Sequence, residues 1–314
     1  MSSYDTREFS RLIKDYAFSI GFDLCGIAEC RPLKAHEEKL KQWAGSGMSA
    51  GLNFLSQDTE RRTNPGSLIS GAKSIIVAGI SYFTPVVQGG EGIPVISRYV
   101  YGEDYHIVVK ERLHLLLEYI ISLYPSAKGL AYVDTGPVLE KAWAVEAGLG
   151  WIGRHSILIN REIGSFLFLG ELILNIKLEY DAPCKEDNCK SCRLCAEACP
   201  TQAINDNKTI DVRRCISWLT VENKEEIPEE FKGKMRNRII GCDICQDVCP
   251  WNINAKPHNK PEFAISPDIL KMTREDWISL SIEKYLELFD HSSVGRIKYE
   301  RLARNIETIA GDKG

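Results

Sequence analysis

The cysteines of this chain are concentrated in one segment, and this distribution constrains the fold more than any other feature. Eight of the eleven cysteines lie between Cys189 and Cys249. Four of them follow the spacing C-x2-C-x2-C-x3-C and end directly before Pro200: Cys189, Cys192, Cys195 and Cys199. This spacing is typical of 4Fe–4S ligation, where three thiolates from one loop bind one cubane and the cysteine before the proline binds the other. The segment is therefore predicted to hold iron–sulfur clusters.

A second, incomplete copy of this spacing ends at Cys249, which also precedes a proline. Cys245 and Cys242 stand four and seven positions earlier, but the position ten residues before Cys249 is Ile239. The second copy therefore lacks one ligand. Cys215 lies between the two copies and can take that place.

Together the two copies supply eight thiolates, the number that two cubanes need. The first cluster is predicted to use Cys189, Cys192, Cys195 and Cys249. The second cluster is predicted to use Cys199, Cys215, Cys242 and Cys245. The alternative is a pair of structural zinc sites, because C-x2-C pairs also bind zinc, but zinc ribbons use separated pairs rather than a triple run. The cysteines left over, read as ordinary thiols, are Cys25, Cys30 and Cys184.

Composition places the chain among ordinary globular proteins. Its 314 residues are long enough for two domains, and 44% of them are apolar and 26% charged. The formal net charge of −4 argues against a general polyanion binder but leaves room for local basic patches. The polar N-terminus is unlike a signal peptide, and the best apolar run, at 74–80, has the length of a strand. A cytoplasmic protein with no membrane segment is expected, and there cysteines serve as metal ligands rather than disulfides.

Before the cysteine segment, helical and strand-like patterns alternate. Amphipathic spacing predicts helices over residues 7–20, 106–124 and 138–147. Short apolar runs predict strands over residues 74–82, 129–133 and 166–174. Such alternation is typical of a layered α/β or α+β domain.

Several short motifs are more specific than packing alone requires. They are RRTNP (61–65), RYVYGEDYH (98–106), VDTGPVLE (133–140), AGLGWIG (147–153), GSFLFLGE (164–171), RCIS (214–217) and GCDICQ (241–246). Together with the cysteine pattern, these motifs closely resemble epoxyqueuosine reductase, a cobalamin-dependent family related to the corrinoid reductive dehalogenases. The resemblance extends over nearly the whole chain in the same order. It implies a short form without the C-terminal helical repeats of longer members.

The resemblance implies three parts and one reaction. The expected parts are a cobalamin-binding α/β catalytic domain over residues 1–180, a ferredoxin-type domain with two 4Fe–4S clusters over 181–255, and a helical segment over 256–314. The implied reaction reduces the epoxide of epoxyqueuosine at the tRNA wobble position to the cyclopentene of queuosine. It consumes two electrons and two protons and releases water.

The resemblance also implies the partners. They are the queuosine-type tRNAs for His, Asp, Asn and Tyr, and an external electron donor that the sequence does not identify; a monomer is expected. Two basic stretches are candidates for phosphate contacts. One contains Lys232, Lys234, Arg236 and Arg238, and the other contains Arg296, Lys298, Arg301 and Arg304. For each stretch a solvated helix face is the alternative.

Asp134 matches the proton donor of the family. Opening an epoxide forms an alkoxide, which needs a proton, and an aspartate with its ordinary pKa of about 3.9 is ionised at neutral pH. A dry, cofactor-covered site is therefore expected to raise the pKa of Asp134. Positions that match the cobalamin-lining residues of the family are Arg62, Ser97, Asp134, Leu158 and Leu169, joined by Ser217 and Asp243 beside the second cluster. Tyr99, Tyr101, Tyr105 and His106 are further candidates for contacts with cofactor or substrate.

Two other functions compete with this interpretation. The first is a corrinoid reductive dehalogenase, but such proteins are usually exported, and the basic stretches suit RNA better than a small halide. The second is a non-catalytic electron carrier or corrinoid-reducing protein. The Asp134 turn argues against a carrier, because a carrier needs no proton donor.

Overall fold

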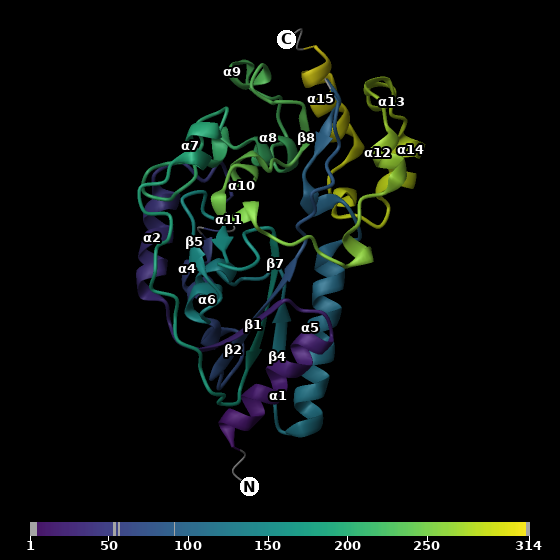
Figure 1. The fold of residues 1–314 in the computed structure, drawn as a ribbon. Helices are drawn as coiled ribbons and strands as arrows, with labels where there is room; N and C mark the ends of the chain where they lie inside the picture. Colours follow the sequence, from purple (N-terminus) through teal and green to yellow (C-terminus); the bar gives the residue numbers. More distant parts are fainter. Residues whose placement is uncertain (1–4, 53–54, 56, 91, 312–314) are drawn as a thin grey trace.

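A four-stranded antiparallel sheet forms the centre of the N-terminal part (Figure 1). The computed structural model describes residues 5–52, 55, 57–90 and 92–311. The strands lie in the order β1 (Leu24–Glu29), β2 (Ser74–Ser81), β7 (Leu167–Leu174) and β4 (Gly129–Tyr132). This order brings together strands from three of the predicted apolar runs and confirms that helices and strands form layers.

Both faces of the sheet are covered, which explains why every residue of β2 is buried. Ile76 and Ala78 pack with α1 (Thr6–Ser19) and α5 (Tyr105–Leu123) in one apolar core. Ile75 and Val77 pack with α6 (Glu140–Glu146) in another, because successive side chains of a strand point to opposite faces. The predicted helices and strands of this region are therefore all present, with ends that differ by one or two residues.

The start of α5 is fixed by a side-chain cap. The carboxylate of Asp104 accepts the backbone N–H of His106 at 3.0 Å, as an N-cap residue does. The helix ends at Leu123, just before Pro125. The cap places Tyr105 and His106 at the first turn of α5, close to the end of β4.

Smaller elements surround the sheet. On the left of Figure 1 lie α2 (Lys34–Gly45), α4 (Thr59–Thr63) and β5 (Trp151–Ile152). The strand β5 pairs with β6 (Leu158–Ile159) in a short antiparallel hairpin. The cysteine segment contributes α7 (Leu194–Ala198), α8 (Ile216–Val221), α9 (Glu229–Lys232), β8 (Arg238–Ile240), α10 (Ile244–Asp247) and α11 (Pro250–Ile253).

The C-terminal helices pack on the cysteine segment rather than on the sheet (Figure 1). They are α12 (Pro267–Lys271), α13 (Arg274–Ile278), α14 (Ile282–Phe289) and α15 (Tyr299–Ala310). Trp277, Phe289 and Ile306 share an apolar core with Ile216 and Ile239. No helix within the described ranges combines the length and the hydropathy needed to cross a membrane.

One strand pair joins the N-terminal part to the cysteine segment. The short strand β3 (Val95–Ile96) runs parallel to β8, more than 140 residues later in the chain. Residues before and after the predicted boundary at 180 therefore share one core. The three-part division stays a prediction, and the β3–β8 pair shows where its first two parts are tied together.

Candidate functional site

Three neighbouring cavities lie between the sheet and the cysteine segment. Their volumes are about 420, 180 and 460 Å³. Lys141 lines all three, and Asp134 and Glu140 line both the second and the third. The cavities therefore adjoin one another around the first turn of α6. We call them the inner cavities.

The four cysteines predicted for the second cluster all line the 420 Å³ inner cavity: Cys199, Cys215, Cys242 and Cys245. They come from the end of the first motif, from the residue before α8, and from the second motif. Burial raises the pKa of Cys242 to about 12 and raises that of Cys245 well above its ordinary value. As free thiols these groups are protonated, so binding iron must displace their protons.

None of the cysteines predicted for the first cluster is among the described residues that line the 420 Å³ cavity. Cys249 is buried beside Trp151 and Ile159, and Cys189 and Cys184 pack against this group. Burial raises the pKa of Cys249 to about 11, and the nearby thiols of Cys189, Cys195 and Cys192 raise it further. Among the described residues, no three His, Cys, Asp or Glu side chains converge closely enough to bind a single ion. A zinc ion needs sulfurs only about 4 Å apart, whereas the larger cubane separates its thiolates further.

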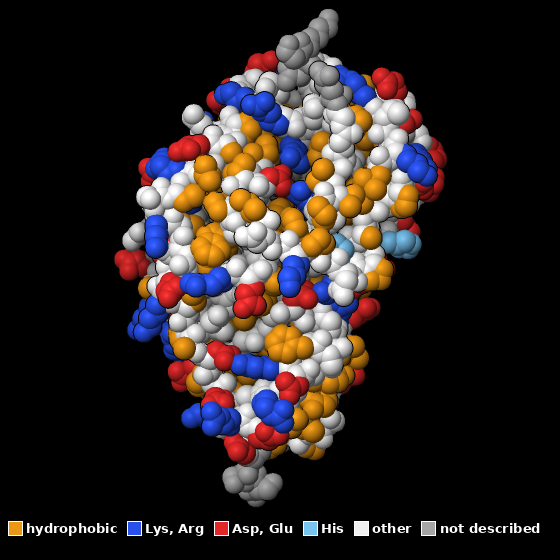
Figure 2. Space-filling view, viewed as in Figure 1, with side chains coloured by type: hydrophobic (Ala, Val, Ile, Leu, Met, Phe, Trp, Pro, Cys, Tyr) orange, Lys and Arg blue, Asp and Glu red, His pale blue; other side chains and the backbone are white. Residues whose placement is uncertain are grey.

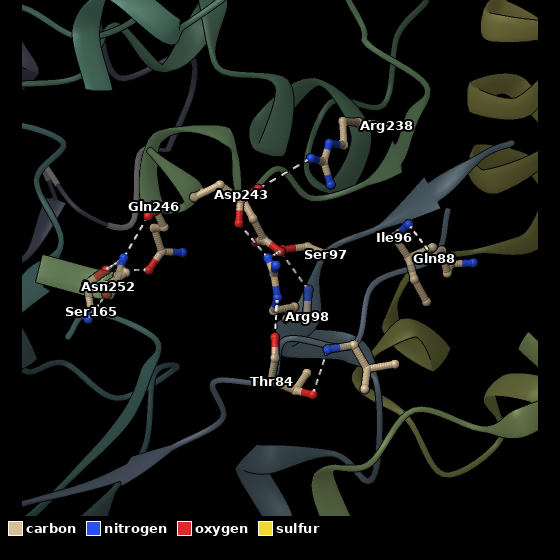
Figure 3. Close-up of polar contacts among 12 residues, drawn as sticks. Thr84, Gln88, Ile96, Ser97, Arg98, Ser165, Arg238, Asp243, Gln246 and Asn252 are labelled. Carbon is tan, nitrogen blue, oxygen red and sulfur yellow. Dashed lines mark hydrogen bonds and ion pairs between the residues drawn. The ribbon is translucent and has the colours of Figure 1, made fainter. Parts of the chain in front are cut away.

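Ser97 and Asp243, both predicted to contact the cofactor, contact each other (Figure 3). The Ser97 hydroxyl donates to Oδ1 of Asp243, and Oδ2 accepts the backbone N–H of Arg98 at 2.9 Å. The Arg98 guanidinium lies 3.2 Å from Asp243 and 2.7 Å from Asp247. Since the side chains of Arg98 and Asp243 are only 9% and 2% exposed, this is a buried ion pair that ties β3 to the second cysteine motif.

The other predicted residues also line the inner cavities. Ser217 lines the 420 Å³ cavity, and Leu158 and Leu169 line the smallest, with Asp134. Arg62 lines the third cavity and donates to the Gly136 carbonyl at 3.2 Å, so it also holds the Asp134 turn. The structure thus brings all seven predicted positions to one site, and their roles there stay predictions.

The backbone of Asp134 is held in an uncommon conformation just after β4. Its φ is +48°, a left-handed conformation that aspartate tolerates better than most residues. The Glu140 carboxylate accepts the Asp134 N–H at 2.5 Å. The turn therefore presents the Asp134 carboxylate, which is 53% exposed, toward the inner cavities.

A chain of hydrogen bonds leads from Asp134 back to α5. Oδ2 of Asp134 accepts from the Tyr105 hydroxyl at 3.1 Å and lies 3.1 Å from Nε2 of His106. Nδ1 of His106 lies 2.6 Å from Oδ1 of Asp104, whose Oδ2 lies 3.3 Å from Nε of Arg296. The imidazole is thus placed between two carboxylates, an arrangement that stabilises its charged form.

The direction of the Asp134 pKa corrects the expectation from the sequence. Burial raises it, but the hydrogen bond and the charge of His106 outweigh burial, and the pKa lies below its ordinary value. For His106, burial lowers the pKa, but the hydrogen bonds to Asp134 and Asp104 outweigh burial and raise it. The expected raised pKa of Asp134 is therefore wrong for this structure. The proton of the pair is held on His106.

Two residues that sequence reasoning missed line the site. Lys141 directly follows the VDTGPVLE motif and makes no hydrogen bond or ion pair within the described ranges. His155 lines the 420 Å³ cavity and is 3% exposed. Its Nδ1 accepts the N–H of Ile157 at 3.2 Å, so the neutral ring carries its proton on Nε2. That N–H is buried and has no hydrogen-bond partner in the described part of the chain. No sequence pattern indicates that His155 lines the site.

Two family models match the chain. The model described as epoxyqueuosine reductase QueG, DUF1730, matches residues 62–135, which include Arg62 and Asp134. The model described as a 4Fe-4S double cluster binding domain matches residues 188–252, which include all eight predicted ligands. The segment is therefore a domain for two 4Fe–4S clusters, as the cysteine spacing predicted.

Curated relatives and solved structures match over nearly the full length. The epoxyqueuosine reductase of Cellulophaga algicola is 43% identical over 96% of this chain and 97% of its own length. The structure of epoxyqueuosine reductase from Bacillus subtilis is 31% identical, with a TM-score of 0.89 over 97% of this chain and 82% of that one. A crystal structure of epoxyqueuosine reductase with an epoxyqueuosine-modified tRNA-Tyr stem loop is 32% identical, with a TM-score of 0.86 over 97% and 81%. The chain belongs to the epoxyqueuosine reductase family and is an oxidoreductase.

Proposed function

We propose that this chain reduces the epoxide of epoxyqueuosine in tRNA to the cyclopentene of queuosine, with cobalamin in the inner cavities. The observation that carries the proposal is the position of Asp134. Its carboxylate faces the 180 and 460 Å³ inner cavities, which adjoin the 420 Å³ cavity lined by the four second-cluster cysteines. A proton donor and an electron source thus meet at one site. A similar enzyme has been crystallised with an epoxyqueuosine-modified tRNA stem loop, which supports the same substrate here.

The lining of the inner cavities fits cobalamin. The 420 Å³ cavity has apolar walls, including Ile157 and Trp218, next to polar groups such as Ser217. The buried Nε2–H of His155 needs an acceptor, and the amide and phosphate oxygens of cobalamin are acceptors. Residues that would hold the group are Arg62, Ser97, Asp134, Leu158, Leu169, Ser217 and Asp243. The chemistry that cobalamin supplies is delivery of electrons to the epoxide.

The two clusters set the direction of electron flow. The second set of cysteines faces the inner cavities, so its cluster is the nearer one to the substrate. The first set lies near Trp151 and Trp251, away from that cavity. This cluster receives electrons from an external donor, whose identity stays open, and the protein works as a monomer.

The first proton comes from the His106–Asp134 pair. The hydrogen bonds to Asp134 and Asp104 raise the pKa of His106, and below that raised pKa its imidazolium lies 3.1 Å from the Asp134 carboxylate. As negative charge develops on the epoxide oxygen, the Asp134 carboxylate takes the proton of His106 and passes it to that oxygen, which leaves His106 neutral. Asp104 stabilises the charged imidazole from the other side, at 2.6 Å.

The phosphate contacts belong to the basic stretch that follows α9. Lys234 and Arg236 are exposed there, beside the second cysteine motif. Arg238 points inward, 3.6 Å from Asp247. In the other stretch, the side chains of Arg301 and Arg304 donate to backbone carbonyls of α8 and of the loop after it. We therefore assign tRNA phosphates of the queuosine-type tRNAs to Lys234 and Arg236.

The Asp134→Asn variant tests the proposal. Asparagine keeps the size of the side chain but holds no acidic proton. The variant is expected to bind both clusters and cobalamin as the wild type does and to reduce the epoxide at least about 100-fold more slowly in a single turnover. An Asp58→Asn variant makes the same change at an exposed aspartate and serves as the control, so it should keep the wild-type rate. Wild-type rates in Asp134→Asn would remove Asp134 from the mechanism.

A further inference from the structure

The proposed reaction consumes two protons, and the His106–Asp134 pair holds only one. Reduction of an epoxide to an alkene takes two electrons and two protons and releases one water, so a second proton must reach the same oxygen before water leaves. The inference that follows rests on the proposed function. It concerns two glutamates, Glu140 and Glu171, that lie in the motifs of the sequence and have no role in the mechanism so far.

Glu140 stands directly beside Asp134. Its Oε1 accepts the Asp134 N–H at 2.5 Å, and its side chain lines the same two inner cavities as the Asp134 carboxylate. Its Oε2 forms no hydrogen bond within the described ranges, so it is available to a group in the cavity. Glu140 therefore lines the same two cavities as Asp134, the residue from which the substrate oxygen receives its first proton in the proposed function.

Glu171 lies in the middle of β7 and is 0% exposed. It pairs with Val77 of β2 on one side and with Tyr132 of β4 on the other. Side chains alternate along a strand, so Glu171 shares a sheet face with Leu167 and Leu169. These two leucines line the smallest inner cavity with Asp134 and Glu140. The side chain of Glu171 is therefore the next one after Leu167 and Leu169 on this face of β7, and it lies under α6.

Both carboxyl oxygens of Glu171 lack a hydrogen-bond partner in the part of the chain that the structure describes. Nε1 of Trp143, on α6 in the same apolar core as Leu169 and Ile173, lacks one too. Unpaired buried donors and acceptors in one layer are the groups that an ordered internal water bridges. Trp143 lies one turn after Glu140 on α6, so such a water has a route between Glu171 and Glu140.

An ionised carboxylate in this position would carry a large cost, because it has neither a counter-charge nor a donor. Burial raises the pKa of Glu171 well above its ordinary value, and the charges of Glu140 and Asp134 raise it further. Burial and the charge of Asp134 raise the pKa of Glu140 to about 7, against the opposing charges of Lys141 and His106. Glu171 therefore carries a proton at neutral pH, and Glu140 gains and loses its proton near pH 7, while Asp134 is ionised.

We propose that Glu140 donates the second proton to the substrate oxygen, which leaves as water, and that Glu171 reprotonates Glu140 through an internal water. The balance is then complete. The two electrons arrive from the clusters, one proton comes from His106 through Asp134, and one comes from Glu140. Glu140 is the catalytic residue of this pair, and Glu171 is its buried proton store.

Infrared spectroscopy tests whether Glu171 holds a proton, and this measurement needs no catalytic turnover. The cluster-loaded protein, with and without cobalamin, should show the C=O stretch of a neutral carboxylic acid at about pH 8, shifted in deuterated water. Glu171→Gln should lose this band, or Glu171→Leu if the glutamine variant fails to fold. Glu162→Gln, at an exposed position, should keep it. If the band is absent from the wild type, or survives both Glu171 variants, Glu171 is not the store and the proposal is wrong.

Single-turnover rates test the donor. Glu140→Gln should be slower than the wild type by at least about tenfold at about pH 6, where Glu140 carries its proton, and by less at about pH 8, where Glu140 of the wild type is largely ionised. Equal rates for Glu140→Gln and the wild type at both pH values would overturn the proposal while leaving the proposed function intact. A wild-type enzyme that forms no queuosine would instead overturn the proposed function, and the proposal with it.

Discussion

At the scale of single residues, the chemistry of the site depends on where one proton lies. The Asp134 carboxylate is ionised because His106 stands 3.1 Å away, and His106 holds the proton because Asp104 lies on its other side at 2.6 Å. The ring of Tyr105 stacks on the ring of Phe168, with 4.3 Å between the ring centroids. This stacking fixes the direction from which the Tyr105 hydroxyl donates its hydrogen bond to Asp134. The donor is therefore a pair of residues rather than a lone aspartate.

The pair predicts how the rate depends on pH. The pKa of His106 is raised above 6.5 in the folded protein, so the proton is present below that raised pKa and is lost as the pH rises through it. The single-turnover rate should fall over that alkaline range. His106→Gln should be slower by about 100-fold at neutral pH and should lose this alkaline decline.

A matched control separates this effect from general loss of a histidine. The side chain of His291 is 89% exposed, and His291→Gln should retain both the rate and the pH profile of the wild type. An alkaline decline that persists in His106→Gln would show that another group carries the proton.

At the scale of elements, sequence patterns could predict what is local. The apolar run of β2 and the amphipathic spacing of α5 predicted those elements, and the spacing of the cysteines predicted both clusters. The contact between Ser97 and Asp243 could not be predicted, because the two residues are 146 positions apart and meet only through the pairing of β3 with β8. The pKa of Asp134 was predicted in the wrong direction for the same reason, since His106 comes from another element.

Because the cysteines form two ligand sets, removing a ligand from one set should cause the loss of only one of the two clusters. Cys215→Ala removes the ligand that lies between the two motifs, so the iron content should fall from about eight to about four per chain while the first cluster remains. Cys184 packs beside Cys189 and Cys249 but belongs to neither set. Cys184→Ala should therefore keep about eight irons, as measured by anaerobic iron analysis. Loss of iron in Cys184→Ala with retention in Cys215→Ala would reverse the assignment.

The junction between β3 and α10 predicts a large effect on stability. Arg98→Met leaves the Asp243 carboxylate, 2% exposed, without its counter-charge. Removing one partner of a buried pair costs about 3–5 kcal/mol of the free energy of unfolding. Arg11→Met, in an exposed pair on α1, should cost less than about 1 kcal/mol. Anaerobic urea unfolding measures both, and equal midpoints would show that the buried pair is not what ties the two parts together.

At the scale of the whole molecule, the surface must bind a polyanion although the net charge is −4. Acidic and basic side chains are interspersed over the face shown in Figure 2, so phosphate contacts depend on local positions rather than on an overall field. Arg236 is exposed beside the second cysteine motif, whereas Lys128 is exposed just before β4.

Charge reversal at these two positions tests that assignment. Arg236→Glu and Lys128→Glu change the net charge equally. Arg236→Glu should weaken tRNA binding by about tenfold at low salt and reduce the salt dependence of the affinity, and Lys128→Glu should change neither. Equal weakening by both variants would mean that net charge, rather than this stretch, governs tRNA binding.

The central claim joins the clusters, the inner cavities and the Asp134 turn in one reaction on tRNA. The most direct measurement loads the anaerobic protein with iron, sulfide and cobalamin, adds a reductant and tRNA containing epoxyqueuosine, and determines the mass of the released nucleoside. The predicted result is a nucleoside lighter by one oxygen atom, formed by the wild type and not by Asp134→Asn. A fully loaded and reduced protein that leaves the nucleoside mass unchanged would contradict the proposed function.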